Sequence, residues 1–500
     1  MTTRRLFIGF FLIYGILIPI FAQEFLLENT SATIAMVSSC LTIALMFYSG
    51  RAFFINIIIT IYVFLNYLTR PFVSIFEKGL YTKNLSYIKE INSFFNPAAA
   101  ATVYWSLFSL LIAWLIGLIL LRCPKDDNAF SLPNIFTRID RVIQKGGAPF
   151  FFVFCLLFIL NYKSLESGLQ GTITGEGSTT FLWGLASLFT IQIVCLYVFI
   201  KRQYDKIKPS NYYLLVLPLI TSLSALFAGS RSSVFFLVVT SFAYWLMLNI
   251  HKKWKLYNLL KLSGVLLVAL SITIISGLFA QVLRPLYRYT EHVSIEDIIT
   301  TLDYESVLLA KENLLFGITQ LLHRLSALKA QFYILNDWYI YEPLQYYNPL
   351  QAFMRVINDL LPGELFPGIL TINQLFDYIY HGTNIHYASE MWGIQGTLYL
   401  YFGHFGSPIV VFLLALMVNR FYPTLEKALL ASSAFAAFIV LLLLDFLTNG
   451  TAERIIIVDI VRPITSFIIF LFLYKLFSSV IRSLHQDVKK SKDTVTKVIE

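Results

Sequence analysis

Long apolar runs recur along this chain, and they restrict its fold more than any other feature. Runs of membrane-spanning length lie near 5–22, 31–49, 52–69, 98–121, 147–162, 180–200, 211–228, 233–250, 259–280, 393–418, 428–447 and 463–480. A helix needs about 20 apolar residues to cross a bilayer, and lipid cannot satisfy the exposed backbone groups of other structures. With 57% hydrophobic residues, the sequence predicts an all-α polytopic membrane protein with about 12 transmembrane helices.

Lysine and arginine indicate the orientation. If Arg4 and Arg5 lie inside, the inside segments hold 24 of the 38 basic residues, so both termini are expected in the cytoplasm. The net charge of +9 is then a topology signal, and no nucleic-acid partner is expected. The first span is expected to stay as a signal anchor, with cleavage after Ala22 as the alternative.

The spans divide the chain unequally. Residues 1–280 form an N-terminal bundle of about nine helices, 281–392 a large extracytoplasmic loop, 393–480 about three further helices and 481–500 a cytoplasmic tail. No repeat of comparable halves is visible, which disfavours an alternating-access carrier. Cysteine spacing indicates neither a disulfide framework nor a metal cluster, and no cofactor is expected.

The large loop is predicted to be a helical module lying against the membrane. Ser294 and Asp297 have capping-box spacing, and apolar residues recur at helical intervals from Val307 to Leu335. Four of the seven histidines lie in this loop. Any chemistry is therefore expected there.

Arginines at the predicted outer boundary are candidates for binding an anion. Arg231 lies in a short break between two apolar spans, where a lone cation favours an anionic partner such as a lipid-linked phosphate. In the loop, Arg288, Arg324 and Arg355 present forked donors that match a diphosphate. The alternatives are a hairpin whose arginine reaches water, and pairing of the loop arginines with local acids or ordinary lipid phosphates.

His386 and Glu390 are the candidate base and its supporting carboxylate. If their stretch is helical, they share one face, and the histidine could remove a proton from a sugar hydroxyl. The alternative is that His386 binds a loop carbonyl while Glu390 caps a helix.

Aromatic residues offer candidate sugar-binding surfaces. Trp338, Tyr341 and Tyr347 present flat apolar faces with polar rims. Such residues also gather at membrane interfaces for physical reasons alone, and this interpretation remains open.

Several of these features resemble one family. The many-helix layout with one late outer loop, the Gly229-Ser230-Arg231-Ser232 turn, and the run of His386, Glu390, Gly393 and Gly396 leading into 399–406 resemble bacterial Wzy-type O-antigen polymerases. The related O-antigen ligases share a similar histidine-to-glycine pattern.

The resemblance implies a membrane glycosyltransferase with a GT-C-like fold in the bacterial inner membrane. It would join undecaprenyl-diphosphate-linked oligosaccharide repeat units at the periplasmic face, without a metal. Membrane lipids and a chain-length regulator protein are the other expected partners. The alternatives are a ligase that transfers the glycan to lipid A core, and a flippase or transporter of the lipid-linked oligosaccharide.

Overall fold

The computed structural model describes residues 2–22, 30–68, 97–120, 134–157, 188–204, 231–249, 393–449 and 460–499, with a few single residues or pairs between 300 and 369. In this part of the chain the regular elements are helices, which confirms the predicted all-α class. The predicted spans 211–228 and 259–280, and almost the whole of the loop 281–392, lie outside the described residues.

The helices follow one another in an order close to the predicted one. The first group consists of α1 (Thr3–Ala22), α2 (Thr30–Ser49), α3 (Phe53–Val63) with the π-helical turn η1 (Phe64–Leu68), and α6 (Pro97–Leu120). The later group consists of α7 (Asn134–Lys145), the short helix Ala148–Leu157, α10 (Leu188–Tyr204), α12 (Arg231–Leu248), α19 (Gly393–Ala431), α20 (Ser433–Asn449) and α22 (Arg462–Ile499).

Five of the described helices are long and apolar enough to cross a membrane. Their apolar windows are Thr3–Ile20, Thr30–Ser49, Ala100–Leu120, Gly393–Ala431 and Pro463–Ser483. Large apolar side chains also face outward, as with Ile16 at 71% exposure and Phe405 at 90%. A soluble monomer rarely exposes continuous apolar surface of this kind, so the helices indicate a membrane protein.

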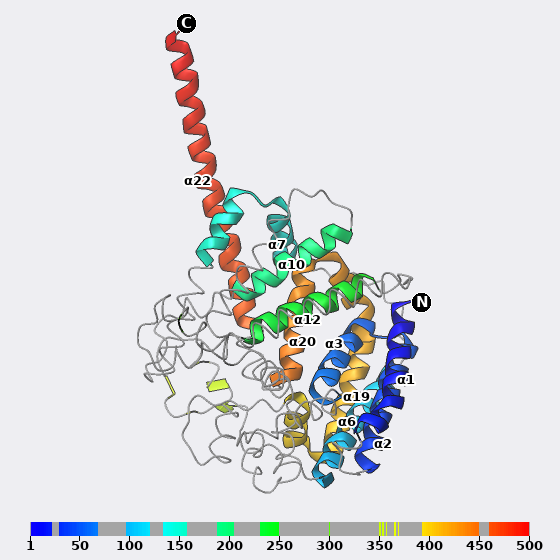
Figure 1. Cartoon of the computed structure of the whole chain (residues 1–500). Helices are drawn as coiled ribbons and strands as arrows, with labels where there is room; N and C mark the ends of the chain where they lie inside the picture. The colour runs from blue at the N-terminus through cyan, green and yellow to red at the C-terminus, as the bar shows by residue number, and fades with distance from the viewer. Residues whose placement is uncertain are drawn as a thin grey trace.

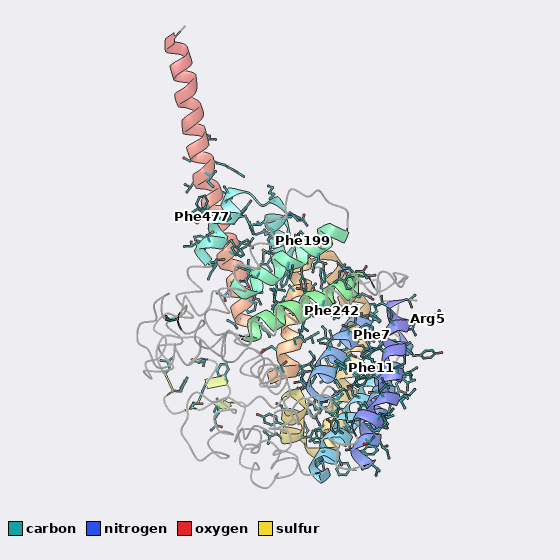
Figure 2. The ribbon with its side chains drawn as sticks, viewed as in Figure 1. Arg5, Phe7, Phe11, Phe199, Phe242 and Phe477 are labelled. Carbon is teal, nitrogen blue, oxygen red and sulfur yellow. The ribbon has the colours of Figure 1, made fainter. Side chains whose placement is uncertain are left out.

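The helices form one continuous core. α2 packs between α1 and α6, α6 packs against α19, and α10 and α12 pack against α20 (Figure 1). Aromatic side chains fill much of the space between them (Figure 2), and Phe11 of α1 is 1% exposed. Tyr197 of α10 and Tyr244 of α12 are stacked with ring centroids 4.2 Å apart.

Two helices extend beyond the apolar runs predicted for them. α19 continues past its kink at Gly403 and through Arg420 and Lys427 to Ala431, and the next helix begins after Ser432. α22 continues through the predicted tail to Ile499 and projects away from the bundle (Figure 1). In both places helix-forming residues extend the helix beyond the end of its apolar run. The cytoplasmic assignment of 481–500 stays a prediction.

Hydropathy did not predict α7, which lies in the predicted inside segment between two spans. Its Phe136, Ile139 and Ile143 are buried, while Arg138 and Arg141 are exposed. The Phe136 ring contacts those of Phe435, Phe438 and Phe467, with centroids 5.2, 5.5 and 5.8 Å apart. This spacing of apolar and basic residues is the amphipathic signal that hydropathy alone does not detect.

Candidate functional site

Basic side chains cap the C-terminal ends of three helices at one end of the bundle, which we call the basic end. Arg4 Nε donates to the Phe47 carbonyl of α2 at 2.6 Å, and Lys201 Nζ donates to the Leu430 carbonyl of α19 at 2.9 Å. The Arg51 guanidinium donates to two carbonyls in the last turn of α6. The last carbonyls of a helix lack partners and carry partial negative charge, so each cation stabilises the helix that it caps.

A glycine makes room for the first of these caps. Gly50 follows α2 with a φ of +69°, the left-handed conformation that commonly ends a helix. A Cβ at this position would lie 2.8 Å from Arg4 Nη1. The turn therefore needs glycine both for its backbone and for the approach of the guanidinium.

Asp140 of α7 caps the start of α20 at the same end. Its Oδ2 accepts the Ser432 hydroxyl at 2.6 Å and its Oδ1 accepts the Ala434 amide at 3.1 Å. The Ser432 hydroxyl in turn accepts the Phe435 amide. Burial raises the pKa of the Asp140 carboxyl, although these hydrogen bonds and the charge of Lys201 act to lower it. The carboxylate thus belongs to the helix cap.

The opposite end of the bundle, which we call the distal end, carries the motif run after Gly393. α6 and α19 both end at the basic end, so both begin at the distal end. α12 also ends at the basic end, where the Thr3 hydroxyl donates to the Asn249 carbonyl at 2.7 Å. Its first residue, Arg231, lies about 27 Å from that anchor along an 18-residue helix that runs across the bundle (Figure 1).

Only the backbone of Arg231 is described. The other predicted site residues lie outside the described residues, so the structure neither brings them together nor separates them. These are His386, Glu390, Arg288, Arg324 and Arg355, together with the aromatic residues Trp338, Tyr341 and Tyr347.

The motif run from Gly393 to Gly406 forms the start of α19 and binds α6 through buried polar side chains. Gln395 Nε2 donates to the Val103 carbonyl at 3.1 Å and also contacts the Ser106 hydroxyl. One turn later the Tyr399 hydroxyl lies 3.0 Å from the Ser109 hydroxyl and donates to the Ser106 carbonyl at 3.2 Å. We call this set the Gln395–Tyr399 cluster. It fixes the first turns of α19 against α6.

Gly403 breaks α19 just after this cluster. Its φ of 67° and ψ of −173° are accessible almost only to glycine, and no atom would meet a Cβ there within 4 Å. The conformation, and not a lack of space, therefore requires this glycine. The His404 ring beyond the break meets the Tyr399 ring edge-on, with centroids 5.1 Å apart.

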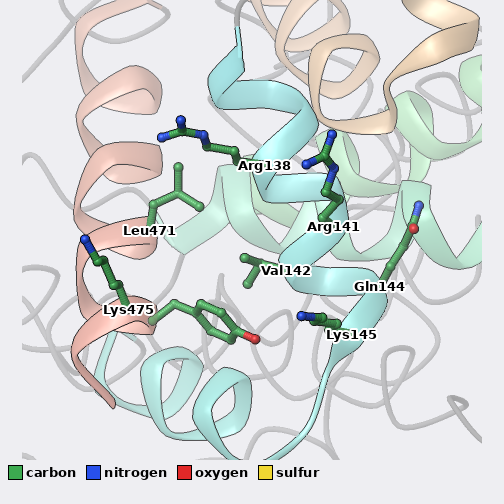
Figure 3. A pocket seen from close by; sticks show the side chains of 8 residues that line it. Arg138, Arg141, Val142, Gln144, Lys145, Leu471 and Lys475 are labelled. Atoms are coloured by element: carbon green, nitrogen blue, oxygen red, sulfur yellow. The ribbon is translucent and has the colours of Figure 1, made fainter. Parts of the chain in front are cut away.

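A cavity of about 600 Å³ lies between α7 and α22 near the basic end (Figure 3). It is lined by Arg138, Arg141, Lys145, Leu471, Tyr474 and Lys475, and we call it the α7–α22 pocket. Among the residues that the structure describes, no group of His, Cys, Asp or Glu side chains could hold a metal ion. The chemistry of this pocket is cationic.

Comparison with protein-family models, curated proteins and solved structures finds no match for this chain.

Proposed function

We propose that this protein is a multi-pass inner-membrane glycosyltransferase that polymerises undecaprenyl-diphosphate-linked oligosaccharide repeat units at the periplasmic face. The observation that carries the proposal is that the Gln395–Tyr399 cluster fixes the motif run after Gly393 against α6 at the distal end. This run, like the turn that contains Arg231, resembles the Wzy-type polymerases. The outer loop 281–392 joins the chain at this end, since it leads directly into Gly393.

In the proposed reaction, the hydroxyl of an incoming repeat unit attacks the anomeric carbon of the growing chain. The bond from that carbon to the diphosphate breaks, and its electron pair stays on the diphosphate oxygen. Arg231 and Arg324, with Arg288 and Arg355 in support, offset the charge that develops there. His386 takes the proton of the attacking hydroxyl, and Glu390 orients and balances the imidazole.

The Gln395–Tyr399 cluster supports this scheme because it fixes the helix that follows the proposed catalytic residues. Gln395 lies five residues after Glu390, and its side chain is 1% exposed and anchored on α6. A fixed first turn of α19 limits the positions open to the adjoining catalytic segment, and catalysis depends strongly on such positioning. Trp338, Tyr341 and Tyr347 would stack on the sugar rings of the acceptor.

The test is the glycan length profile of a strain that lacks the protein and is complemented with variants. We expect Arg231→Ala, Arg324→Ala and His386→Ala to leave single repeat units where the wild type gives long chains. Arg5→Ala is the matched control, because Arg5 is exposed at the basic end and its loss should leave long chains (Figure 2). Normal long chains from all three test variants would overturn the site assignment.

The same strain separates the alternatives. A polymerase loss leaves single units attached to the final acceptor, a ligase loss leaves long chains that are not attached, and a flippase loss leaves no units outside. A transporter would also be expected to line its spans with charged residues, and the predicted spans are nearly free of them.

A further inference from the structure

The α7–α22 pocket combines four cations from two helices that are far apart in sequence. Arg138, Arg141 and Lys145 come from α7, and Lys475 comes from α22. All four side chains are exposed. Arg138 and Lys145 extend from α7 toward α22, on which Leu471 and Lys475 lie (Figure 3). The charges of both helices therefore meet over one cavity.

In the part of the chain that the structure describes, neither lining helix supplies an acidic side chain to this pocket. The one acidic residue in the sequence of α7 is Asp140, and its two oxygens accept from Ser432 and Ala434 at the start of α20. In α22 the first acidic residue is Asp487, three helical turns beyond Lys475. Four like charges around one cavity repel each other, and an anion between them would offset that repulsion.

The cavity has the size of a ligand site and a lining that suits a phosphate headgroup. Its volume of about 600 Å³ lies within the range of small-molecule pockets. Tyr474 adds a hydroxyl, and Arg138 and Arg141 add planar donor groups that suit phosphate oxygens. The lining thus matches a phosphate with a small polar substituent.

An exposed apolar stripe beside the pocket favours a lipid over a free phosphate as the ligand. On α22, Ile468, Phe472 and Leu476 follow one another at four-residue spacing and are 55%, 66% and 50% exposed. Lys475 adjoins this stripe in sequence, so a phosphate held by the pocket could carry acyl chains along it. α7 is an amphipathic helix of the kind that lies at the membrane interface.

We propose that the α7–α22 pocket binds the headgroup of an anionic phospholipid, whose acyl chains lie along the stripe of α22. The bound lipid joins α7 to α22 at the basic end, away from the distal end where polymerisation is proposed. Basic pockets between membrane helices commonly hold such headgroups.

The experiment uses the purified full-length protein and measures the binding of phosphatidylglycerol, with phosphatidylcholine as the neutral comparison. The test variant is Arg138→Gln/Arg141→Gln/Lys145→Gln. The control is Arg5→Gln/Arg420→Gln/Arg482→Gln, which removes the same charge from exposed positions outside the pocket. We expect about a hundredfold weaker phosphatidylglycerol binding in the test variant, since each cation near an anionic surface contributes roughly fivefold. We expect less than a fivefold change in the control.

Two outcomes would overturn the proposal. Equal weakening in the test and control variants would mean that the total charge, and not the pocket, attracts the lipid. Competition by inorganic phosphate at the same concentration as phosphatidylglycerol would mean that the acyl chains add nothing. A photoreactive phosphatidylglycerol on the unaltered protein provides a readout independent of the variants, and it should label peptides containing residues 134–145 and 468–476.

Discussion

Single polar residues at the basic end hold together helices that are far apart in the chain. Asp140 is the clearest example, because one carboxylate joins α7 to the first turn of α20 across nearly 300 positions. Removing the carboxylate leaves the buried Ser432 hydroxyl and the buried Ala434 amide without these acceptors. The cost of such a change is larger than that of losing an ordinary surface contact.

We therefore expect Asp140→Ala to lower the free energy of unfolding by about 2 kcal/mol, the upper range for the loss of an N-terminal helix cap. Asp140→Asn should cost less than half of this, because the amide can accept from Ala434 and donate to the Ser432 hydroxyl. Thermal unfolding of the purified protein in detergent measures both. Equal melting temperatures for the wild type and the alanine variant would contradict the role assigned to this cap.

The raised pKa of Asp140 also predicts a pH dependence. In the folded protein the Asp140 carboxyl has a pKa above its ordinary value of 3.8. As the pH rises, the unfolded chain therefore loses this proton at a lower pH than the folded protein does. Stability from this group is complete below pH 3.8 and falls as pH rises through the folded pKa. The variant Asp140→Asn should show a smaller fall over this interval in unfolding curves recorded at successive pH values. An identical slope in both proteins would exclude Asp140 as its source.

At the level of elements, α6 and α19 approach each other closely at Gly117. A Cβ there would lie 2.6 Å from Ala415 Cβ and 2.7 Å from the Phe412 carbonyl oxygen. Small residues allow membrane helices to pack at short distance, so this pair depends on glycine at one face and alanine at the other. The same two helices hold the Gln395–Tyr399 cluster near their distal end.

Gly117→Ala should therefore push the two helices apart and lower the free energy of unfolding by about 1–3 kcal/mol. The double variant Gly117→Ala/Ala415→Gly should recover part of this loss, because it removes one of the two clashes and leaves the one with the carbonyl. The measurement is again thermal unfolding. A single variant as stable as the wild type would show that the helices are not in contact at this point.

The sequence predicted elements better than it predicted their ends. Each predicted apolar run is mainly helical in the part that the structure describes, because a helix buried in lipid requires apolar composition over its full span. The apolar runs could not place the turn between α19 and α20, because the start of α20 is capped by Ser432 and by Asp140, which is distant in the chain. Nor could they reveal the contact of Gln395 with Ser106, since hydropathy carries no information about which helices become neighbours.

For the site, the sequence supplied candidates and the structure located a part of them. The motif run after Gly393 lies at the distal end, because α19 is anchored at the basic end by its last turn and its first turns contact the start of α6. Arg231 is located only as the first residue of α12. The roles of His386, Glu390 and the loop arginines remain predictions that rest on residue chemistry and the family resemblance. The α7–α22 pocket was missed because α7 was counted only as positive charge in an inside loop.

At the scale of the whole molecule, segments predicted to be inside meet at one end. The start of α1 is hydrogen-bonded to the end of α12 there, and the turn between α19 and α20 is hydrogen-bonded to the end of α10 and to Asp140 of α7. α22 passes α7 at the pocket and continues outward from the same end (Figure 1). An alternating bundle should have this arrangement if each loop lies on the side that its charge favours.

Reporter fusions test the arrangement directly. Fusions after Gly146 and after Glu500 should report the cytoplasm, and a fusion after Tyr346 should report the opposite side. The physical reason is that Gly146 follows α7 at the basic end and α22 leads outward from the same end (Figure 1). Tyr346 belongs to the loop that precedes the distal start of α19. A cytoplasmic signal from Tyr346 would overturn the proposed periplasmic reaction.

The cations at the basic end carry a further implication for how this sequence can drift. If the predicted orientation holds, exposed Arg5 contributes its charge to insertion, and a lysine at a nearby position could replace it over generations. Arg51 and Lys201 would then be under two selective demands, because the charge that orients the nascent chain is also the donor group that caps a neighbouring helix. A cation moved along the chain from either position would keep its effect on insertion and lose the cap.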